Sequence, residues 1–305
     1  MSRKRIGFMK FMKFMNIQIE QLQSANRFGT AKNYQKSLKS FSTFLKGRDV
    51  TVSAVNKELI WQYNTYLINK GLVKNSISFY MRILRTVYNQ AVKQKFVTQS
   101  HPFADVYTGI DQTRKRAVPE TVVKELKNLN LDNNPELSLA RDLFIFSYCC
   151  RGMSFVDVAF LKKNDIKDGV ICYKRKKTGQ LMMVKIEPCI KAIMERYNSN
   201  SSIYVFPILK SVEYSNAFRE YQSAINIYNR NLRRLSVMLQ LESKLTSYTA
   251  RHSWATAARK HNIPISIISA GMGHTSEQTT RIYLAMLENI VIDNANQTIL
   301  NGLGV

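Results

Sequence analysis

The sequence is 305 residues long, with 45% hydrophobic and 22% charged residues. A chain of this size and composition can bury enough apolar surface for two folded domains, which excludes a largely disordered protein. It contains 45 Lys and Arg against 21 Asp and Glu, a formal net charge of +24 at pH 7. Because this charge opposes compaction through self-repulsion, we expect a polyanionic partner.

The positive charge is concentrated near the N-terminus. Residues 1–118 carry 21 Lys and Arg against 5 Asp and Glu, whereas residues 119–305 carry 24 against 16. This asymmetry predicts an N-terminal module that grips a phosphate backbone and a C-terminal module with a different task. A generally basic protein without such a partner is the alternative.

Neither secretion nor a membrane span is predicted. The basic start is followed by an apolar run over residues 8–15, but lysines interrupt it, unlike a signal peptide or a spanning helix. The cysteines form no C-x-x-C pair, and their apolar neighbours are typical of reduced core thiols: Cys149, Cys150, Cys172 and Cys189. We therefore expect a cytoplasmic, nucleoid-associated protein without disulfides or structural zinc.

Helical periodicity dominates residues 17–107, after a basic extension expected over residues 1–16. One helix is expected after a cap at Thr30, a second over residues 58–69 and a third from Lys74 onward. Basic residues within and just beyond the third helix are candidate DNA ligands: Arg82, Arg85, Lys93 and Lys95. The pattern predicts a small DNA-binding bundle with a basic face.

A linker is predicted over residues 108–118. Pro102 ends the helical pattern, and the segment that follows contains Gly109 and the basic run Arg114-Lys115-Arg116. Turn-forming residues and charge in one stretch are typical of a solvated connection. The basic run is a further candidate for contacts to a duplex; a simple tether is the alternative.

The remaining module, residues 119–305, is predicted to be mostly α-helical with one small antiparallel sheet. Helical patterns begin at Pro119 and resume at Cys189. Between them, two apolar stretches over residues 170–173 and 181–186 flank a basic turn, which predicts a β-hairpin.

Several groups that could bind a phosphate or transfer a proton to it follow one another along this module. Arginine presents a planar fork that suits two oxygens of one phosphate, and a lysine on a tight turn can reach a single atom. A glycine-flanked histidine is followed nine positions later by a tyrosine. The groups are Arg151, Lys177, Arg251, His274 and Tyr283. They predict a phosphate site beside a hydroxyl nucleophile.

The order and spacing of these residues resemble the tyrosine recombinase (phage integrase) family. The stretch Arg151-Gly152-Met153-Ser154-Phe155-Val156-Asp157 is similar to recombinases of Bacteroides-type mobile elements and invertases. Three boxes carry the resemblance: Tyr248-Thr249-Ala250-Arg251-His252 around the family's second arginine, Met272-Gly273-His274 and the lysine turn Lys177-Thr178-Gly179. The resemblance covers residues 119–305. The helices before them are similar to the family's SAM-like core-binding domain.

Two positions depart from the family pattern. Tyr248 stands where the family has a histidine, and Ser154 stands where it has its first arginine. If the segment is helical, Arg151 shares a face with Ser154 and can reach the same phosphate. Alternatively, Arg151 is a structural or DNA-backbone residue. Asp157 is a candidate for orienting an arginine or is a surface carboxylate, and His252 is expected to pack behind the site.

The resemblance implies that Tyr283 attacks a DNA phosphate, forms a 3′-phosphotyrosyl bond and releases a 5′-hydroxyl, with no metal, ATP or other cofactor. Arg251 and His274, with Arg151 and the hydrogen-bonding Tyr248, would neutralise the transition state. Lys177 would protonate the leaving oxygen.

The resemblance also implies double-stranded DNA as the partner and a homotetramer joined by exchange of C-terminal segments. Residues 290–305 are the candidate segment; a helix packed on its own domain is the alternative. Site-specific recombination, as integration, excision or inversion, is the predicted activity. A type IB topoisomerase-like relaxing enzyme and a catalytically inactive DNA-binding regulator are the alternatives.

Overall fold

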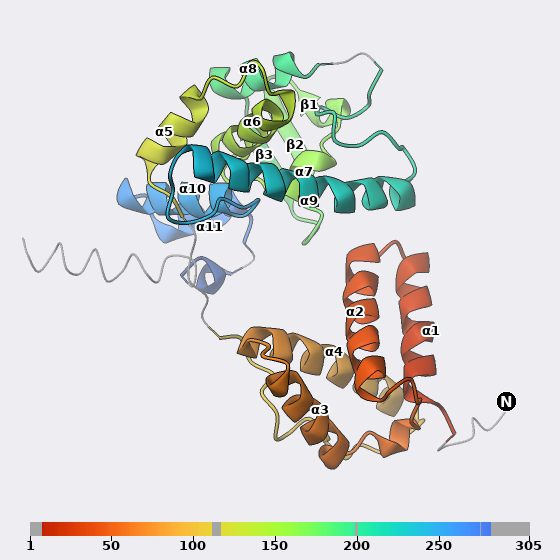
Figure 1. Ribbon diagram of the computed structural model, residues 1–305. Coiled ribbons are helices and arrows are strands. Elements are labelled where there is room, and N and C mark those ends of the chain that lie inside the picture. The colour runs from red at the N-terminus through yellow and green to blue at the C-terminus, as the bar shows by residue number, and fades with distance from the viewer. Residues whose placement is uncertain (1–7, 112–116, 199–200, 275, 282–305) are drawn as a thin grey trace, which may run out of the picture. The chain divides into compact units, whose positions relative to one another are not determined.

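The computed structural model describes residues 8–111, 117–198, 201–274 and 276–281. The chain forms two compact units, residues 1–113 and 114–305, and each is described by itself (Figure 1). None of the described helices is long and apolar enough to cross a membrane.

The first unit is a helical bundle. Its elements are α1 (Phe11–Ser24), α2 (Phe28–Phe44), the 3-10 turn η1 (Val52–Ala54), α3 (Lys57–Asn69) and α4 (Lys74–Lys93). Their apolar faces meet in one core around Tyr63, Met81 and Tyr88, each at most 1% exposed. Because α2 begins at Phe28, Thr30 lies inside its first turn and is not the cap that the sequence suggested.

The start of α1 differs from the basic extension expected over residues 1–16. Its buried face comprises Phe11, Met12, Phe14, Met15 and Ile19. The carboxylate of Asp49 closes the helix start, because it accepts hydrogen bonds from the backbone N–H groups of Met12 (2.9 Å) and Lys13 (3.1 Å). The Phe-Met-Lys repeat is therefore an amphipathic helix, with Lys13 exposed beside its buried face.

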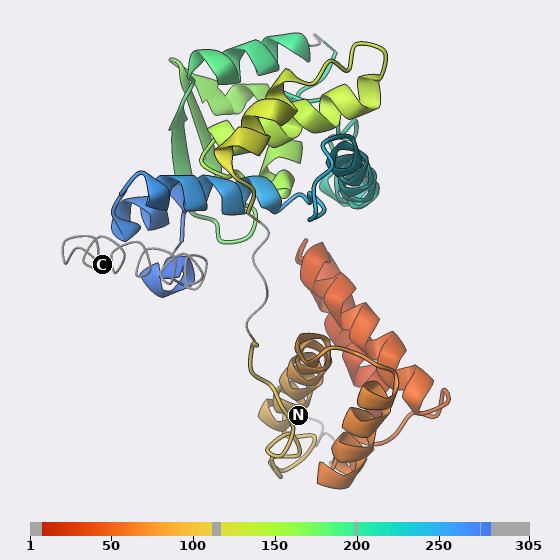
Figure 2. The same cartoon turned by 60° about the vertical axis from the view of Figure 1, so that its left-hand side comes forward.

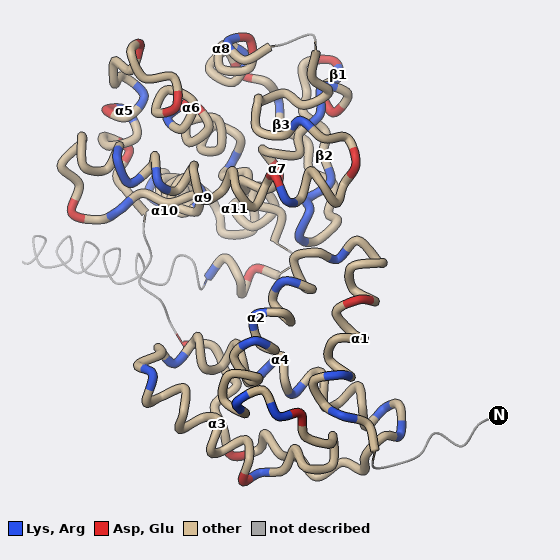
Figure 3. Tube along the Cα trace, turned by 45° about the vertical axis from the view of Figure 1, so that its right-hand side comes forward, with Lys and Arg blue, Asp and Glu red and all other residues tan. Residues whose placement is uncertain are grey.

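Residues 108–111, the start of the expected linker, pack on α4. Arg85 donates a hydrogen bond of 2.8 Å to the Thr108 hydroxyl, and the Asn75 side chain bonds both the N–H and the carbonyl of Asp111. Lysines and arginines are spread over several helices of this unit (Figure 3).

The second unit is mostly helical and contains one small sheet. Its helices are α5 (Glu120–Asn128), α6 (Pro135–Cys149), α7 (Phe155–Ala159), the 3-10 turn η2 (Lys163–Asp165), α8 (Pro188–Arg196), α9 (Tyr214–Met238), α10 (Thr249–Lys260) and α11 (Ile265–Met272). The strands are β1 (Ile166–Lys167), β2 (Val170–Lys174) and β3 (Leu181–Lys185). This architecture confirms the fold class predicted from the sequence.

Helix α6 forms the centre of the second unit. Four consecutive residues, Leu143 to Phe146, are each at most 4% exposed, so this part of the helix is covered on every side. Helices α5, α8, α9 and α10 pack against it. This arrangement ties the start of α10 to the end of α6, where the candidate site lies.

The sheet is antiparallel in the order β1-β2-β3. Ile171 lies opposite Val184 and Tyr173 opposite Met182, and all four side chains are buried. Because strand side chains alternate between faces, the next inward position after Tyr173 is Arg175, which is only 8% exposed. Figure 2 shows the loop end of the sheet, in green, beside the blue helices α10 and α11.

Candidate active site

A cavity of about 350 Å³ opens in the second unit where the β2–β3 turn meets α10 and the end of α11. The charged and hydrogen-bonding side chains that line it include Ser154, Arg175, Lys177, Tyr248, Arg251 and His274. These residues come from segments far apart in the sequence. A hollow with three converging cations is suited to a phosphate group.

Arg251, in the first turn of α10, forms the floor of the cavity and is 4% exposed. Its guanidinium donates to the carbonyls of Gly152 (2.8 Å) and Met272 (2.6 Å) and contacts Nε2 of His274 at 3.1 Å. Gly152 has a φ of 71°, and a Cβ there would lie 2.7 Å from the Arg251 Cα. The close approach of these two backbones therefore requires glycine.

His274 follows the left-handed Gly273 that ends α11. Because an arginine N–H can only donate, Nε2 of His274 accepts from Arg251 and the ring proton sits on Nδ1, 2.8 Å from the Thr280 hydroxyl. Burial, and then the positive charges of Arg251, Arg175 and Lys177, lower the pKa of His274 to about 4. The imidazole is therefore neutral at pH 7 in the free protein.

Arg175 is the residue of this cavity that the sequence analysis missed. Its guanidinium donates to the Gly273 carbonyl, next to the Met272 carbonyl that Arg251 holds. Gly273 has a φ of 63°, and a Cβ there would lie 2.6 Å from the Met182 Sδ and 2.9 Å from the Arg175 Cδ, so a side chain at this position would be strained and would crowd Arg175. The signal was available in the alternation of β2, which places Arg175 on the face of Ile171 and Tyr173.

Lys177 stands at the tip of the β2–β3 turn and is exposed. It lines the cavity, and its charge contributes to the lowered pKa of His274. The turn is closed by hydrogen bonds from the Arg175 N–H to the Gln180 carbonyl (2.9 Å) and from the Gly179 N–H to the Arg175 carbonyl (2.8 Å). A cation on a short, closed turn can approach one oxygen of a bound phosphate.

Asp157 connects the start of α7 to this turn. Its side chain, 4% exposed, accepts from the Ser154 hydroxyl at 2.6 Å and from the Lys176 backbone N–H at 2.7 Å. Its burial shows that the surface-carboxylate alternative is wrong, whereas the expectation that it orients an arginine stays a prediction. Asp157 joins the β2–β3 hairpin to the start of α7 through its hydrogen bonds with the Lys176 N–H and the Ser154 hydroxyl. Ser154 also lines the cavity.

Arg151 does not share a helical face with Ser154. Its φ is 58° and that of Gly152 is 71°, so two left-handed residues follow α6, and Ser154 has extended backbone before α7. A Cβ built on Gly271 would lie 3.7 Å from the Arg151 Cδ, which puts that side chain along α11. Arg151 does not line the cavity, so the helical argument for its reaching the phosphate is wrong.

Tyr248 lies at the start of α10, is 50% exposed and lines the cavity. Its ring centroid is 6.2 Å from that of His252, which does not line the cavity. Their roles stay predictions. So do the roles of the basic residues of the first unit, of which Lys93 and Lys95 are exposed.

Some predicted site residues lie outside the described residues. They are Tyr283, the linker run Arg114-Lys115-Arg116 and the C-terminal segment 290–305.

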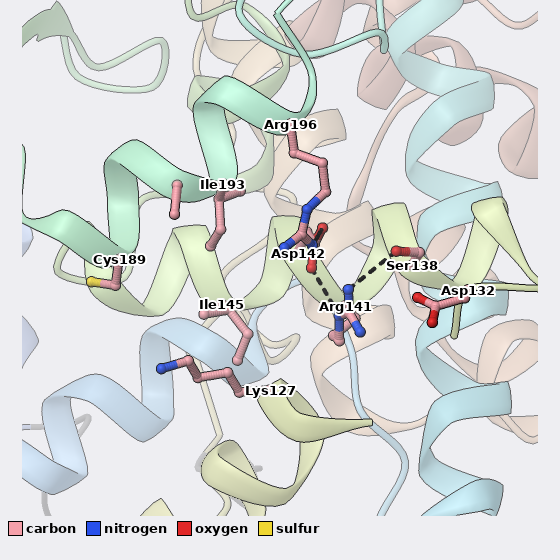
Figure 4. Close-up of a pocket in the computed structure, with 10 residues that line it drawn as sticks. Lys127, Asp132, Ser138, Arg141, Asp142, Ile145, Cys189, Ile193 and Arg196 are labelled. Atoms are coloured by element: carbon pink, nitrogen blue, oxygen red, sulfur yellow. Dashed lines mark hydrogen bonds and ion pairs between the residues drawn. The ribbon is translucent and has the colours of Figure 1, made fainter. Parts of the chain in front are cut away.

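A second cavity, of about 490 Å³, lies between α5, α6 and α8 (Figure 4). It contains the buried Asp142, which accepts from Arg141 at 2.8 Å, from Arg196 and from the Tyr197 hydroxyl at 2.7 Å. Because these arginines already neutralise a buried carboxylate, the cluster is suited to holding α6 against α8. Within the described residues, no group of three His, Cys, Asp or Glu side chains could hold a metal ion.

Family comparisons agree with this geometry. Residues 10–106 match the phage integrase SAM-like domain, and residues 122–289 match the phage integrase family. The chain belongs to the phage integrase family. The second match includes every residue of the cavity described above, and it extends through Tyr283.

Two curated relatives of this integrase-family chain are tyrosine recombinases. It is 21% identical over 289 residues to XerD of Staphylococcus saprophyticus, covering 90% of this chain and 92% of that protein. It is 23% identical over 265 residues to XerC of Halalkalibacterium halodurans, covering 83% and 86%. The resemblance seen in the sequence is thus confirmed for the family.

A solved structure with the same fold is that of a lambda integrase tetramer bound to a Holliday junction. The TM-score is 0.62 at 15% sequence identity, with 92% of this chain and 78% of that chain covered. At this identity the likeness concerns the fold, which includes both units.

Proposed function

We propose that this chain is a site-specific DNA recombinase that cleaves and rejoins strands through a 3′-phosphotyrosyl intermediate at Tyr283. The observation that carries the proposal is the convergence of Arg175, Lys177, Arg251 and His274 on one cavity. Family membership and the tyrosine recombinase relatives support the reaction type.

In this proposal Arg251 and Arg175 bind the scissile phosphate. Both guanidiniums are held by backbone carbonyls of adjacent residues, Met272 and Gly273, so their forks are oriented before DNA arrives. A donor that is already in place costs no reorganisation as negative charge grows in the transition state. Arg175 thereby supplies the second arginine that Ser154 cannot.

The cleavage step would balance as follows. The Tyr283 hydroxyl gives its proton to water and its oxygen bonds to phosphorus, while the bond from phosphorus to the 5′-oxygen breaks. Lys177 gives its proton to that oxygen, because an alkoxide is a poor leaving group. Storing the bond energy in the phosphotyrosine allows a second 5′-hydroxyl to reverse the step without ATP.

His274 has a separate role in the proposal. With its proton on Nδ1, its Nε2 accepts from Arg251 in the free protein. A bound phosphate would raise the pKa of the imidazole, since an adjacent negative charge favours the cation. His274 would then donate a hydrogen bond to a phosphate oxygen. The charge of its imidazole would therefore depend on whether a phosphate is bound.

Partners and location belong to the same proposal. The lambda integrase relative is described as a tetramer on a Holliday junction, which supports a double-stranded DNA substrate and a homotetramer here. We propose that residues 290–305 join the protomers, that the protein is cytoplasmic and nucleoid-associated, and that the Bacteroides-type branch applies. A chain shortened to end at Glu288 should bind one site but lose tetramers in DNA cross-linking.

The deciding experiment uses a nicked duplex from which the cleaved 5′ end diffuses away. The wild-type protein should form a covalent complex with DNA in EDTA, and Tyr283→Phe should abolish it. Tyr221→Phe is the matched control, because it removes another hydroxyl at the cavity; it should still form the complex. Absence of any complex with wild type would leave the regulator, and relaxation of a plasmid without a specific site would indicate the topoisomerase.

A further inference from the structure

Lys176, in the β2–β3 turn, contacts aromatic side chains outside the cavity. It lies between Arg175 and Lys177, which line the cavity, whereas Lys176 does not. Its ammonium nitrogen lies 4.7 Å from the centroid of the Phe160 ring and 5.2 Å from that of Tyr214. Both distances are within the range of a cation–π interaction.

The aromatic partners of Lys176 belong to the helical part of the unit. Phe160 follows α7 and is 6% exposed, and Tyr214 begins α9. Their ring centroids are 5.4 Å apart. The ammonium of Lys176 therefore connects the turn to two helices at once.

The main chain of Lys176 is fixed as well. Its N–H donates to the buried Asp157 carboxylate at 2.7 Å, and the other oxygen of Asp157 accepts from Ser154 at 2.6 Å. The residue is thus held by its backbone toward α7 and by its side chain toward the two rings. Two anchors on one residue restrict the peptide plane that leads to Lys177.

We propose that Lys176 is a positioning residue that fixes the Lys177 ammonium at the leaving 5′-oxygen. The inference rests on the proposed recombinase function and deepens it. Lys174 and Lys176 are both exposed, and what distinguishes Lys176 is the contact of its ammonium with the rings of Phe160 and Tyr214. Loss of the contact between Lys176 and the two rings would allow the β2–β3 turn to move and would misplace Lys177, the general acid. Phosphate binding by Arg175 and Arg251 would remain.

A change of leaving group separates this role from folding or DNA binding. When sulfur replaces the bridging 5′-oxygen, the Tyr283 oxygen still bonds to phosphorus, and the phosphorus–sulfur bond breaks. The thiolate departs with the electron pair and needs no proton, because a thiol is far more acidic than an alcohol. A defect in placing Lys177 should therefore vanish with the sulfur substrate.

The experiment measures single-turnover cleavage of nicked duplexes with oxygen or sulfur at the 5′ bridge, at saturating full-length protein. The Lys176→Met variant should cleave the oxygen substrate about tenfold or more slowly than the wild type. It should cleave the sulfur substrate at nearly the wild-type rate. Lys177→Ala should show the same pattern with a larger loss. Lys176→Arg should retain activity, since arginine also seats on aromatic rings.

Two further variants keep the test decisive. Tyr214→Leu removes one ring but leaves the lysine, and it should give a smaller defect that sulfur also corrects. Lys174→Met removes a charge from the same hairpin and should respond equally to both substrates. If Lys176→Met slows both substrates equally, or slows neither, the positioning role is wrong. If wild type forms no covalent complex with either substrate, the proposed function itself fails.

Discussion

Two turns of the second unit contribute to the candidate site in opposite ways. The α6–α7 turn, residues 150–154, contributes mainly backbone: the Gly152 carbonyl accepts from Arg251 at 2.8 Å, and the Arg151 side chain lies along α11. The β2–β3 turn, residues 175–180, contributes side chains, because Arg175 and Lys177 both line the cavity. The α6–α7 turn thus orients the guanidinium of Arg251, whereas the β2–β3 turn supplies two further cations, Arg175 and Lys177.

If the cavity binds a phosphate as proposed, the difference means that the arginine absent at Ser154 is supplied from another turn. The α6–α7 turn contacts Arg251 through the backbone of Gly152, whose carbonyl accepts the hydrogen bond. This contact needs no side chain in the turn. A second guanidinium, that of Arg175, comes from the β2–β3 turn at the same cavity. The charge at a phosphate site is thus set by which side chains converge, and not by which turn carries them.

The strongest test of this contrast compares the two arginines. Arg175→Ala should lower the rate of covalent complex formation about 10²–10³-fold, the usual loss for one preorganised donor. Arg151→Ala should lower it by less than about tenfold, since its side chain does not line the cavity. Single-turnover cleavage with saturating enzyme gives both rates. Equal losses, or a greater loss for Arg151→Ala, would contradict the assignment.

The backbone role of the first turn is tested at Gly152. A left-handed alanine costs about 1–2 kcal/mol. Gly152→Ala should lower the free energy of unfolding by more than this, because its Cβ would clash with the Arg251 backbone. Gly179→Ala is the matched control: it has the same φ of 71°, with nothing within 4 Å of the added Cβ. Urea unfolding measures both. Similar values for the two variants would remove the argument for a required close approach.

The contrast also predicts which turn controls the charge of His274. Its pKa of about 4, lowered from 6.5, means that protonation is disfavoured in the fold, so this group's contribution to stability is lost as the pH falls from 6.5 toward 4. Arg175→Met should raise the pKa of His274, because it removes a nearby positive charge. NMR titration of the imidazole measures it, with Arg151→Met as the control. An unchanged pKa in Arg175→Met would argue against their proximity.

The smallest expected effect concerns the hydroxyl that joins the two turns. Ser154→Ala removes a hydrogen bond to the buried Asp157 and should cost about 1–2 kcal/mol of unfolding free energy. Cleavage should fall by less than about tenfold, because the Lys176 N–H still holds Asp157 in place. Thr178→Ala, at an exposed position of the same cavity, should leave the unfolding free energy within about 0.5 kcal/mol of wild type. A loss for Ser154→Ala no larger than that would show that the hydroxyl is dispensable.

Local patterns in the sequence were sufficient for much of the fold. The three-and-four spacing of apolar residues predicted α3 and α4, and alternation around a basic turn predicted the β2–β3 hairpin. The spacing between Arg251 and His274 placed them in one site only through the family resemblance; the structure shows that this spacing spans helix α10, a turn and helix α11.

The errors arose where distant residues decide the local structure. The N-terminal repeat becomes helix α1 because Asp49, 37 positions from Met12, closes its start. Arg175 was hidden in a run of four basic residues, and only the buried face of the sheet distinguishes it from Lys174 and Lys176. The helical argument for Arg151 failed because two left-handed residues end α6.

The short segment Met272-Gly273-His274 has a consequence for selectivity. In the free protein, two of its carbonyls and one ring nitrogen occupy N–H groups of Arg251 and Arg175. An arginine has five N–H donors, so these bonds fix the plane of each guanidinium without using all of its donors. A phosphate that approaches within that plane can be bound, whereas one that approaches from another direction meets no donor. The internal bonds that orient the arginines would therefore select a phosphate by its direction of approach and not by its charge alone.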